Sequence, residues 1–263
     1  MSDAAVTYTS YLRVGDLLAL QVPRSDGPEH DELLFIIVHQ VYELWFKQIL
    51  WELDHVIGLL DVDDEHRAGH TLRRVLAILK VMVAQMDVLE TMTPLEFMSF
   101  RSRLDSASGF QSVQFRELES VLGLKDRTAL ERAGATGPAR QRLEARLHAP
   151  SLWDAFCAHL ARRNFAVSPD VLQRDVTLPV VADLSVQEAL IAAYRTDPAM
   201  AELCERFVDL DEGVQEWRYR HVKMVERTIG VKPGTGGSAG AGYLRTTLGR
   251  PLFPDLWEIR ARL

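Results

Sequence analysis

Residues 33–60 are apolar on almost every helical face, and this run limits the possible fold more than any other part of the sequence. Four charged residues interrupt it, so it reads as a packed helix and not as a membrane span: Glu43, Lys47, Glu52 and Asp54. A helix that is apolar on most sides needs other helices around it. The run therefore predicts a helix over 31–60, with Asp31 as its N-cap, at the centre of a helical bundle.

The rest of the chain repeats the helical period, and no alternation of apolar and polar residues lasts long enough to indicate a sheet. We therefore predict an all-α fold. Pro94 suits the first turn of a helix, because a missing N–H costs nothing there. The further predicted helices cover 11–21, 64–92, 94–104, 111–122, 152–163, 186–194 and 199–229, with two short ones in the tail 243–263.

The chain shows no internal repeat and no low-complexity linker, so residues 1–263 are predicted to form a single domain. Residues of about 125–200 are expected to form a less central helical insertion. A loop is expected at 134–138, where small residues and a proline cluster.

The net charge of −7 argues against a nucleic-acid partner, whose affinity would come from neutralising phosphates. Cys157 and Cys204 are far apart and lack metal-finger spacing, which predicts two buried, reduced thiols. Residues 1–10 contain no apolar core of a signal peptide. The expected location is the cytoplasm, with no membrane association.

Two histidines are candidates for chemistry. His39 shares a helical face with Phe35, four residues earlier. Such a histidine is often only a core residue, but a buried imidazole near neutral pH also donates or accepts a proton readily. His221 lies among basic residues late in the last long helix, which suits either a surface position or an axial ligand. Histidines on two helices of a bundle could face each other across a flat cofactor.

Arg101 follows a run of apolar residues, and its planar guanidinium fits a carboxylate. The alternative is a side chain that reaches solvent or pairs with a nearby glutamate. The glycine-rich segment 230–242 loosely matches a dinucleotide fingerprint, but it follows a helix and not a strand, so we reject that interpretation. It suits a mobile flap whose backbone can approach a ligand, with the Thr235 hydroxyl available there.

Four groups of residues together resemble the tryptophan 2,3-dioxygenase family, in the family's order and spacing, from about residue 8 to the C-terminus. Residues of about 125–200 contribute little to this resemblance. The matching groups are Tyr8–Leu12, His30–Trp45, Phe97–Arg101 with Ser108–Ser112, and Trp217–His221 with Gly234–Ser238.

The resemblance implies a fold and a cofactor. It implies a helical bundle that holds haem b between central helices, with His221 as the proximal iron ligand. Ser108 and Gly109 match the loop on the distal side of the haem. Met86 and Leu104 complete the implied haem surroundings.

The resemblance also implies how a substrate is held. His39 corresponds to the distal histidine that meets the indole N–H, and Phe35 and Phe97 to the aromatic wall. Arg101 would bind the substrate carboxylate, and Thr235 in the flap its ammonium and carboxylate groups. The N-terminal segment would reach into a neighbouring subunit of a homotetramer through Tyr8, Tyr11 and Leu12.

The implied reaction is the oxidation of L-tryptophan by O₂ to N-formyl-L-kynurenine, the entry to the kynurenine pathway. The protein would position the substrate and exclude water while the haem carries the difficult step. Two alternatives stay open at this point. One is a monooxygenase of the same superfamily that acts on a substituted indole in secondary metabolism. The other is a non-catalytic helical bundle.

Three positions depart from the family pattern. Thr9 replaces a common glycine, Ser106 replaces a common proline, and Met86 stands where some members have an aromatic residue. The first two could reshape the pocket mouth and so affect which indole is accepted. Arg101 and Thr235 are retained, which favours an amino-acid substrate, because an indole without a carboxylate would leave a buried arginine unpaired.

Overall fold

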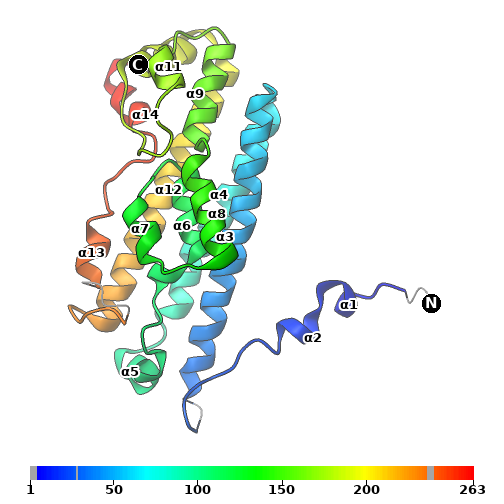
Figure 1. Cartoon of the computed structure of the whole chain (residues 1–263), viewed down its shortest axis with the longest axis vertical. Helices are drawn as coiled ribbons and strands as arrows, with labels where there is room; N and C mark the ends of the chain where they lie inside the picture. The colour runs from blue at the N-terminus through cyan, green and yellow to red at the C-terminus, as the bar shows by residue number, and fades with distance from the viewer. Residues whose placement is uncertain (1–4, 28, 236–239) are drawn as a thin grey trace.

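The computed structural model describes residues 5–27, 29–235 and 240–263, and every regular element in that part of the chain is helical. The predicted all-α fold is confirmed. Three long helices run side by side: α3 (His30–Asp61), α4 (Glu65–Leu89) and α12 (Pro198–Ile229). Helix α4 packs against both of the others, so it and not α3 is the middle member (Figure 1).

Shorter elements cover the sides and ends of these three helices. At one end of the molecule α9, α11 and α14 gather, and α5 lies near the other end (Figure 1). The α-helices are α1 (Tyr8–Leu12), α2 (Val14–Leu17), α5 (Pro94–Phe100), α6 (Val113–Val121), α7 (Arg127–Arg132), α8 (Gly137–His148), α9 (Leu152–Arg162), α10 (Pro169–Leu172), α11 (Leu184–Thr196), α13 (Ala241–Arg245) and α14 (Pro254–Glu258). The 3₁₀ turns are η1 (Arg101–Leu104), η2 (Gly109–Gln111) and η3 (Ile259–Arg262).

The predicted N-cap of α3 is wrong: the helix begins at His30 without a side-chain cap, and Asp31 lies inside its first turn, where a negative charge still favours the helix N-terminus. Side-chain caps do set the start of other predicted helices. The Thr93 hydroxyl accepts a hydrogen bond from the Glu96 N–H, and Pro94 occupies the first turn of α5 as predicted. The Asp197 carboxylate caps the start of α12 in the same way. Helix α12 ends at Gly230, whose φ of 62° is readily adopted only by glycine.

The predicted helix over 11–21 is wrong in its extent. The structure has two short helices that meet at Arg13, which adopts a left-handed φ of 50°, and the second ends at Leu17. Neither helix buries a residue, so packing does not offset the cost of continuing the helix. The arm that they form extends away from the body of the molecule (Figure 1).

The predicted loop at 134–138 extends two residues too far. Gly137 and Pro138 are the first residues of α8, because a proline in the first turn loses no helical hydrogen bond. The small residues around them supply a tight connection from α7 to α8, with Gly134 at a φ of 64°.

The position of α3 differs from the prediction that other helices surround it. One side packs in the core, but four apolar residues on the opposite side are exposed: Leu33, Ile37, Leu44 and Trp51. Successive members of this set are four or seven residues apart in the sequence, so they lie along one stripe of the helix. By length and apolar character α3 could cross a membrane, but core helices of soluble proteins meet the same criteria. Residues of α3 such as Leu53 and Val56 are fully buried inside the protein.

The core continues into the C-terminal third of the molecule. Both cysteines are buried and unpaired, as predicted. The Asp211 carboxylate of α12 is fully buried and accepts hydrogen bonds from the Leu252 and Phe253 backbone N–H groups and from the Trp257 indole. These bonds fix the C-terminal tail to the long helix, because breaking any of them would leave a buried donor unpaired.

A second buried carboxylate makes stability depend on pH. Asp255 is fully buried, and burial raises its pKa to about 6, although it accepts hydrogen bonds from the Asp183 backbone N–H and the Gln187 side chain. One of its oxygens has no hydrogen-bond partner among the residues that the structure describes. The folded state therefore binds a proton more tightly than the unfolded state, so this group's favourable contribution to stability is present at low pH and is lost as pH rises from about 4 to 6.

We expect Asp255→Asn to remove the free-energy cost of ionising this buried carboxylate. The variant keeps the accepting oxygen and cannot ionise, so it should gain about 2 kcal/mol relative to the wild type between pH 4.5 and pH 7. Denaturant unfolding of both proteins at the two pH values measures this difference. If the free energies of unfolding of the variant and the wild type differ by the same amount at both pH values, Asp255 either stays protonated or stays hydrated in the folded wild type.

Candidate functional site

Phe35 and His39 form a fixed pair on α3. The two rings are 4.1 Å apart between centroids, and His39 Nδ1 lies 2.7 Å from the carbonyl oxygen of Phe35, one turn earlier. A carbonyl can only accept, so Nδ1 carries the proton of the neutral imidazole and Nε2 has a free lone pair. His39 is accessible to solvent, yet the protein packed around it lowers its pKa. At neutral pH its Nε2 can therefore accept a hydrogen bond.

Aromatic side chains of α5 complete the surroundings of Phe35. Its ring is 5.7 Å from Phe97 and 5.6 Å from Phe100, and those two rings are 5.5 Å apart at nearly a right angle. The fully buried Phe100 anchors this group in the core. The structure thus brings together the predicted residues Phe35, His39 and Phe97 as one apolar, aromatic wall.

His221 lies on α12, one turn after Trp217. The two rings are parallel within 1° and 5.5 Å apart, and Trp217 in turn packs against Phe46 and Phe115. Burial and, to a lesser extent, the electrostatic effect of His39 lower the pKa of His221 to about 4. Its ring is therefore neutral at neutral pH. Neither ring nitrogen makes a hydrogen bond with another residue in the described parts of the chain.

These features fit an iron porphyrin. A neutral imidazole with a free nitrogen is what an axial ligand requires, and His221 has no protein group competing for either nitrogen. His39 lies near enough for its charge to affect His221, as a distal residue would. Met86 is buried in α4, and Leu104 in η1 is partly buried against the core, so both add apolar surface.

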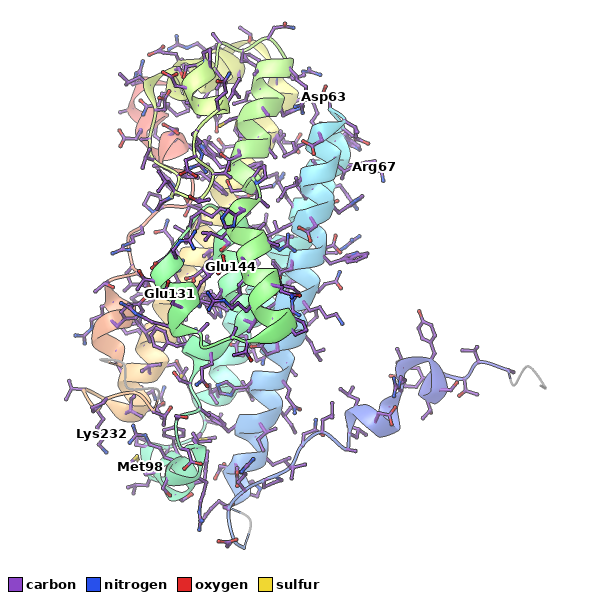
Figure 2. All side chains as sticks on the ribbon, viewed as in Figure 1. Asp63, Arg67, Met98, Glu131, Glu144 and Lys232 are labelled. Carbon is purple, nitrogen blue, oxygen red and sulfur yellow. The ribbon has the colours of Figure 1, made fainter. Side chains whose placement is uncertain are left out.

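Arg101 begins η1, immediately after α5, and contacts the glycine-rich segment. Its Nη2 donates a hydrogen bond to the Pro233 carbonyl oxygen at 2.6 Å. The Thr235 hydroxyl donates to the carbonyl oxygen of Ala107, in the loop after η1. These contacts dock the described part of the flap, residues 230–235, on the predicted carboxylate site. Figure 2 shows Met98 of α5 and Lys232 of the flap at the same end of the molecule.

The two ends of the flap touch at Gly240. A Cβ there would lie only 2.7 Å from the carbonyl oxygen of Lys232, and the φ of 59° is itself costly for any other residue. Residues 236–239 lie outside the described part of the chain, and so does the resemblance over 236–238.

We expect Gly240→Ala to lower kcat/KM for the substrate about tenfold, because the added methyl group would push Lys232 away and displace the docked segment. Gly249→Ala is the matched control: its φ is 70°, but open space surrounds the position of its Cβ. Steady-state kinetics of both variants test this. Equal losses in the two would assign the effect to backbone strain alone.

Other predicted residues are not gathered at this site within one chain. Tyr8 and Tyr11 are each 77% exposed and Leu12 is 46% exposed on the projecting arm, which also carries Thr9. Ser108 caps η2, which begins at Gly109, through a reciprocal pair of hydrogen bonds with Gln111 and Phe110. This turn leads through Phe110 to Tyr243, whose ring is 5.0 Å away.

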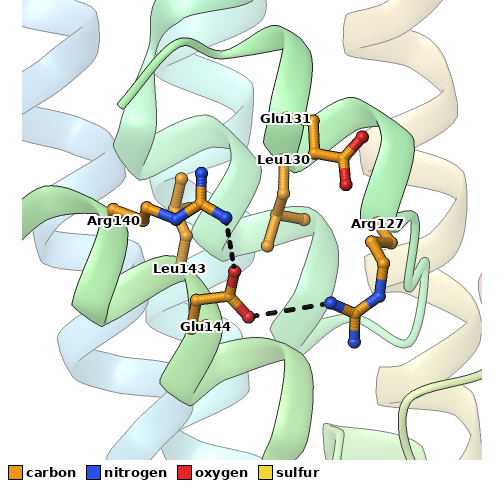
Figure 3. Close-up of a pocket in the computed structure, with 6 residues that line it drawn as sticks. All are labelled: Arg127, Leu130, Glu131, Arg140, Leu143 and Glu144. Atoms are coloured by element: carbon orange, nitrogen blue, oxygen red, sulfur yellow. Dashed lines mark hydrogen bonds and ion pairs between the residues drawn. The ribbon is translucent and has the colours of Figure 1, made fainter. Parts of the chain in front are cut away.

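Two surface depressions lie away from this group. One is lined by six residues of α7 and α8, where the Glu144 carboxylate pairs with Arg140 and Arg127 (Figure 3). The other lies between α4 and α12 and is rimmed by charged residues such as Arg73 and Glu216. Neither contains a predicted site residue.

One cluster on the helix of His221 has no counterpart among the predicted site residues. Arg116 and Glu119 of α6 meet Arg218 of α12, and all three side chains are largely buried. No spacing within one helix signals this pairing, since its members come from helices about one hundred residues apart. The only sequence signal is an arginine inside the motif that contains His221.

Comparisons with known proteins identify the family. The profile of a family described as tryptophan 2,3-dioxygenase matches residues 1–135 and 151–263. A tryptophan 2,3-dioxygenase of Herpetosiphon aurantiacus is 60% identical over 98% of this chain and 99% of its own length. Proteins of the same name from Anaeromyxobacter sp. (strain K) and Caulobacter vibrioides are 57% and 44% identical, over 99% and 98% of this chain and 97% and 98% of their own lengths.

Proposed function

The chain belongs to the tryptophan 2,3-dioxygenase family, and on that premise we propose that it is a haem-dependent enzyme that oxidises L-tryptophan with O₂ to N-formyl-L-kynurenine. The observation that carries this proposal is one group of residues: Phe35, His39 and Phe97 form an aromatic wall, and Arg101 meets the flap beside it. A non-catalytic bundle has no use for a neutral histidine, a cation and a glycine-rich flap together.

We assign the haem to His221. Its neutral ring would hold the iron, and the stacked Trp217 would fix the plane of that ring. Haem b, when bound, supplies the activation of O₂ that side chains cannot perform. Met86, Leu104, Ser108 and Gly109 would surround the porphyrin.

The protein's own contribution is to hold the indole and its amino-acid portion. His39 Nε2 would accept a hydrogen bond from the indole N–H, since its Nδ1 is already committed to the Phe35 carbonyl. The free donors of Arg101 would bind the substrate carboxylate, away from the reacting C2=C3 bond. Thr235 would contact the ammonium and carboxylate groups once the flap is closed, and closure would exclude water.

We propose a homotetramer with shared active sites. The arm that carries Tyr8, Tyr11 and Leu12 buries nothing within its own chain and extends from the body, as a segment that enters a neighbouring subunit would. The exposed stripe on α3 supplies further apolar surface for assembly. The cytoplasm is the proposed location, in agreement with the two unpaired, buried cysteines.

Product analysis tests this function. Haem-loaded, reduced protein is given O₂ with L-tryptophan and, separately, with a 2-alkylindole, and the products are weighed by mass spectrometry. We expect two oxygen atoms in a ring-opened product of L-tryptophan. One oxygen atom, added only to the simple indole, would instead identify a monooxygenase of the same superfamily and leave Arg101 without a role in substrate binding.

A further inference from the structure

Two buried arginines lie beside the helix that carries His221. Arg116 of α6 is 7% exposed and Arg218 of α12 is 6% exposed. An arginine is seldom buried to this extent unless an anion is paired with it. The guanidinium of Arg116 is further shielded by the ring of Phe115, whose centroid lies 4.7 Å from the Arg116 Cζ atom.

These arginines share one carboxylate. Arg116 Nη1 is 2.6 Å from one oxygen of Glu119, and Arg218 Nη2 is 3.7 Å from the other, which is longer than a hydrogen bond. Burial raises the pKa of Glu119 in spite of both cations, and burial lowers the pKa of Arg218. One carboxylate, in close contact with Arg116 and beyond hydrogen-bond distance from Arg218, therefore faces two positive charges.

The hydrogen-bonding capacity of the cluster is mostly unused. Among the described residues Arg218 has no hydrogen-bond acceptor, and the buried Nε of Arg116 and the buried hydroxyl of Ser120 have no partner. Asp211 acts on Arg218 electrostatically, but its carboxylate already accepts bonds from the C-terminal tail, and Arg250 adds positive charge. The cluster therefore has hydrogen-bond donors that no acceptor among the described residues uses.

A series of aromatic contacts connects this cluster to His221. Arg218 is three residues before His221 on α12, which is about 4.5 Å along the helix axis. Arg116 follows Phe115, whose ring is 5.2 Å from Trp217, and Trp217 stacks on His221. An anion brought by a group bound at His221 would therefore reach this cluster more easily than one from bulk solvent.

We propose that Arg218 and Arg116 form a carboxylate site that receives a propionate of the haem. The inference rests on the proposed function, since it takes haem as the group bound at His221. A carboxylate would accept hydrogen bonds from Arg218 and from the unused Arg116 Nε, and it would balance the excess positive charge. Arg101 remains the residue for the substrate's own carboxylate.

The test compares haem with its dimethyl ester, which has the same ring and iron but no charged carboxylates. Each is loaded onto the full-length protein, and its loss to an excess of a haem-scavenging globin is followed by absorbance. We expect the ester to leave the wild-type protein about tenfold or more faster, the effect of one charged hydrogen-bonded pair. This comparison needs no variant.

Two variants test whether Arg218 is the residue that distinguishes haem from its ester. In Arg218→Met, haem and ester should leave at rates within about twofold of each other, because the group that distinguishes them is gone. Arg206→Met is the matched control: it makes the same change on the same helix, at a residue ion-paired with Asp209, and should retain the wild-type ratio.

Each contrary result points to a different conclusion. Equal loss of haem and ester from the wild-type protein would refute the carboxylate site while leaving haem binding intact. A wild-type ratio retained in Arg218→Met would refute the role of this cluster. An unchanged ratio with a raised KM for L-tryptophan would assign the cluster to the substrate instead. A protein that takes up neither porphyrin would refute the proposed function itself.

Discussion

Replacement of His221 by alanine is expected to abolish haem retention. Among the described residues, no other histidine has all three properties of His221: a neutral ring, two ring nitrogens without a hydrogen bond, and a stacked aromatic neighbour. The iron would therefore have no axial ligand from the protein. The absorbance of the purified variant in the Soret region, relative to protein concentration, measures this loss. We expect less than about a tenth of the wild-type haem content, which corresponds to a loss of more than about 1.4 kcal/mol in affinity.

His66→Ala is the matched control, because His66 is an exposed histidine near the start of α4. It should bind haem normally. Circular dichroism of both variants without haem checks that His221→Ala is still folded. A fully loaded, active His221→Ala protein would overturn the assignment of the proximal ligand.

The second large effect concerns the substrate's carboxylate. Arg101→Ala should lower kcat/KM for L-tryptophan about 10- to 100-fold, the value of a charge-assisted hydrogen bond of about 1.5–3 kcal/mol. A carboxylate-free indole should lose much less. Its remaining loss would come from the flap, because Arg101 also donates to the Pro233 carbonyl.

Gly240→Ala separates the two contributions of Arg101. That variant disturbs the flap, including the proposed Thr235 contacts, without removing the guanidinium, so its loss for each substrate measures how much of the loss in Arg101→Ala comes from the flap. Steady-state kinetics with both substrates, in both variants, gives the four rates needed. Equal losses in Arg101→Ala for both substrates would leave Arg101 with a role in flap docking only.

Much of the fold follows from local sequence patterns. The long helices agree with their predicted ranges to within a few residues, because their apolar period extends over many turns and two of the three have an explicit side-chain cap, at Asp64 and at Asp197. The arm was predicted as one helix and is broken at Arg13. The two helices of that segment bury no residue, and it meets α3 through hydrogen bonds of Leu20 and Gln21 with Gln40, so periodicity alone could not decide its conformation.

In the candidate site, too, a contact within one helix follows from the sequence, whereas contacts between distant residues do not. The pairing of Phe35 with His39 follows from their spacing on one helix, and their contact is confirmed. The docking of Arg101 on Pro233 and the meeting of Arg116 with Arg218 join residues more than one hundred positions apart. Such contacts depend on how α5, α6 and α12 pack, which no local pattern determines.

We expect the exposed stripe on α3 to link catalysis to protein concentration. Leu33 and Ile37 lie on either side of Phe35 along the chain, and Ile37 is two residues from His39, so a subunit seated on this stripe would rest on the same helical turns that position the substrate. If those turns acquire their final order only in the assembly, then separated subunits are poor catalysts, and the balance between the two forms follows mass action. Specific activity should then fall on dilution and recover when the enzyme is concentrated again.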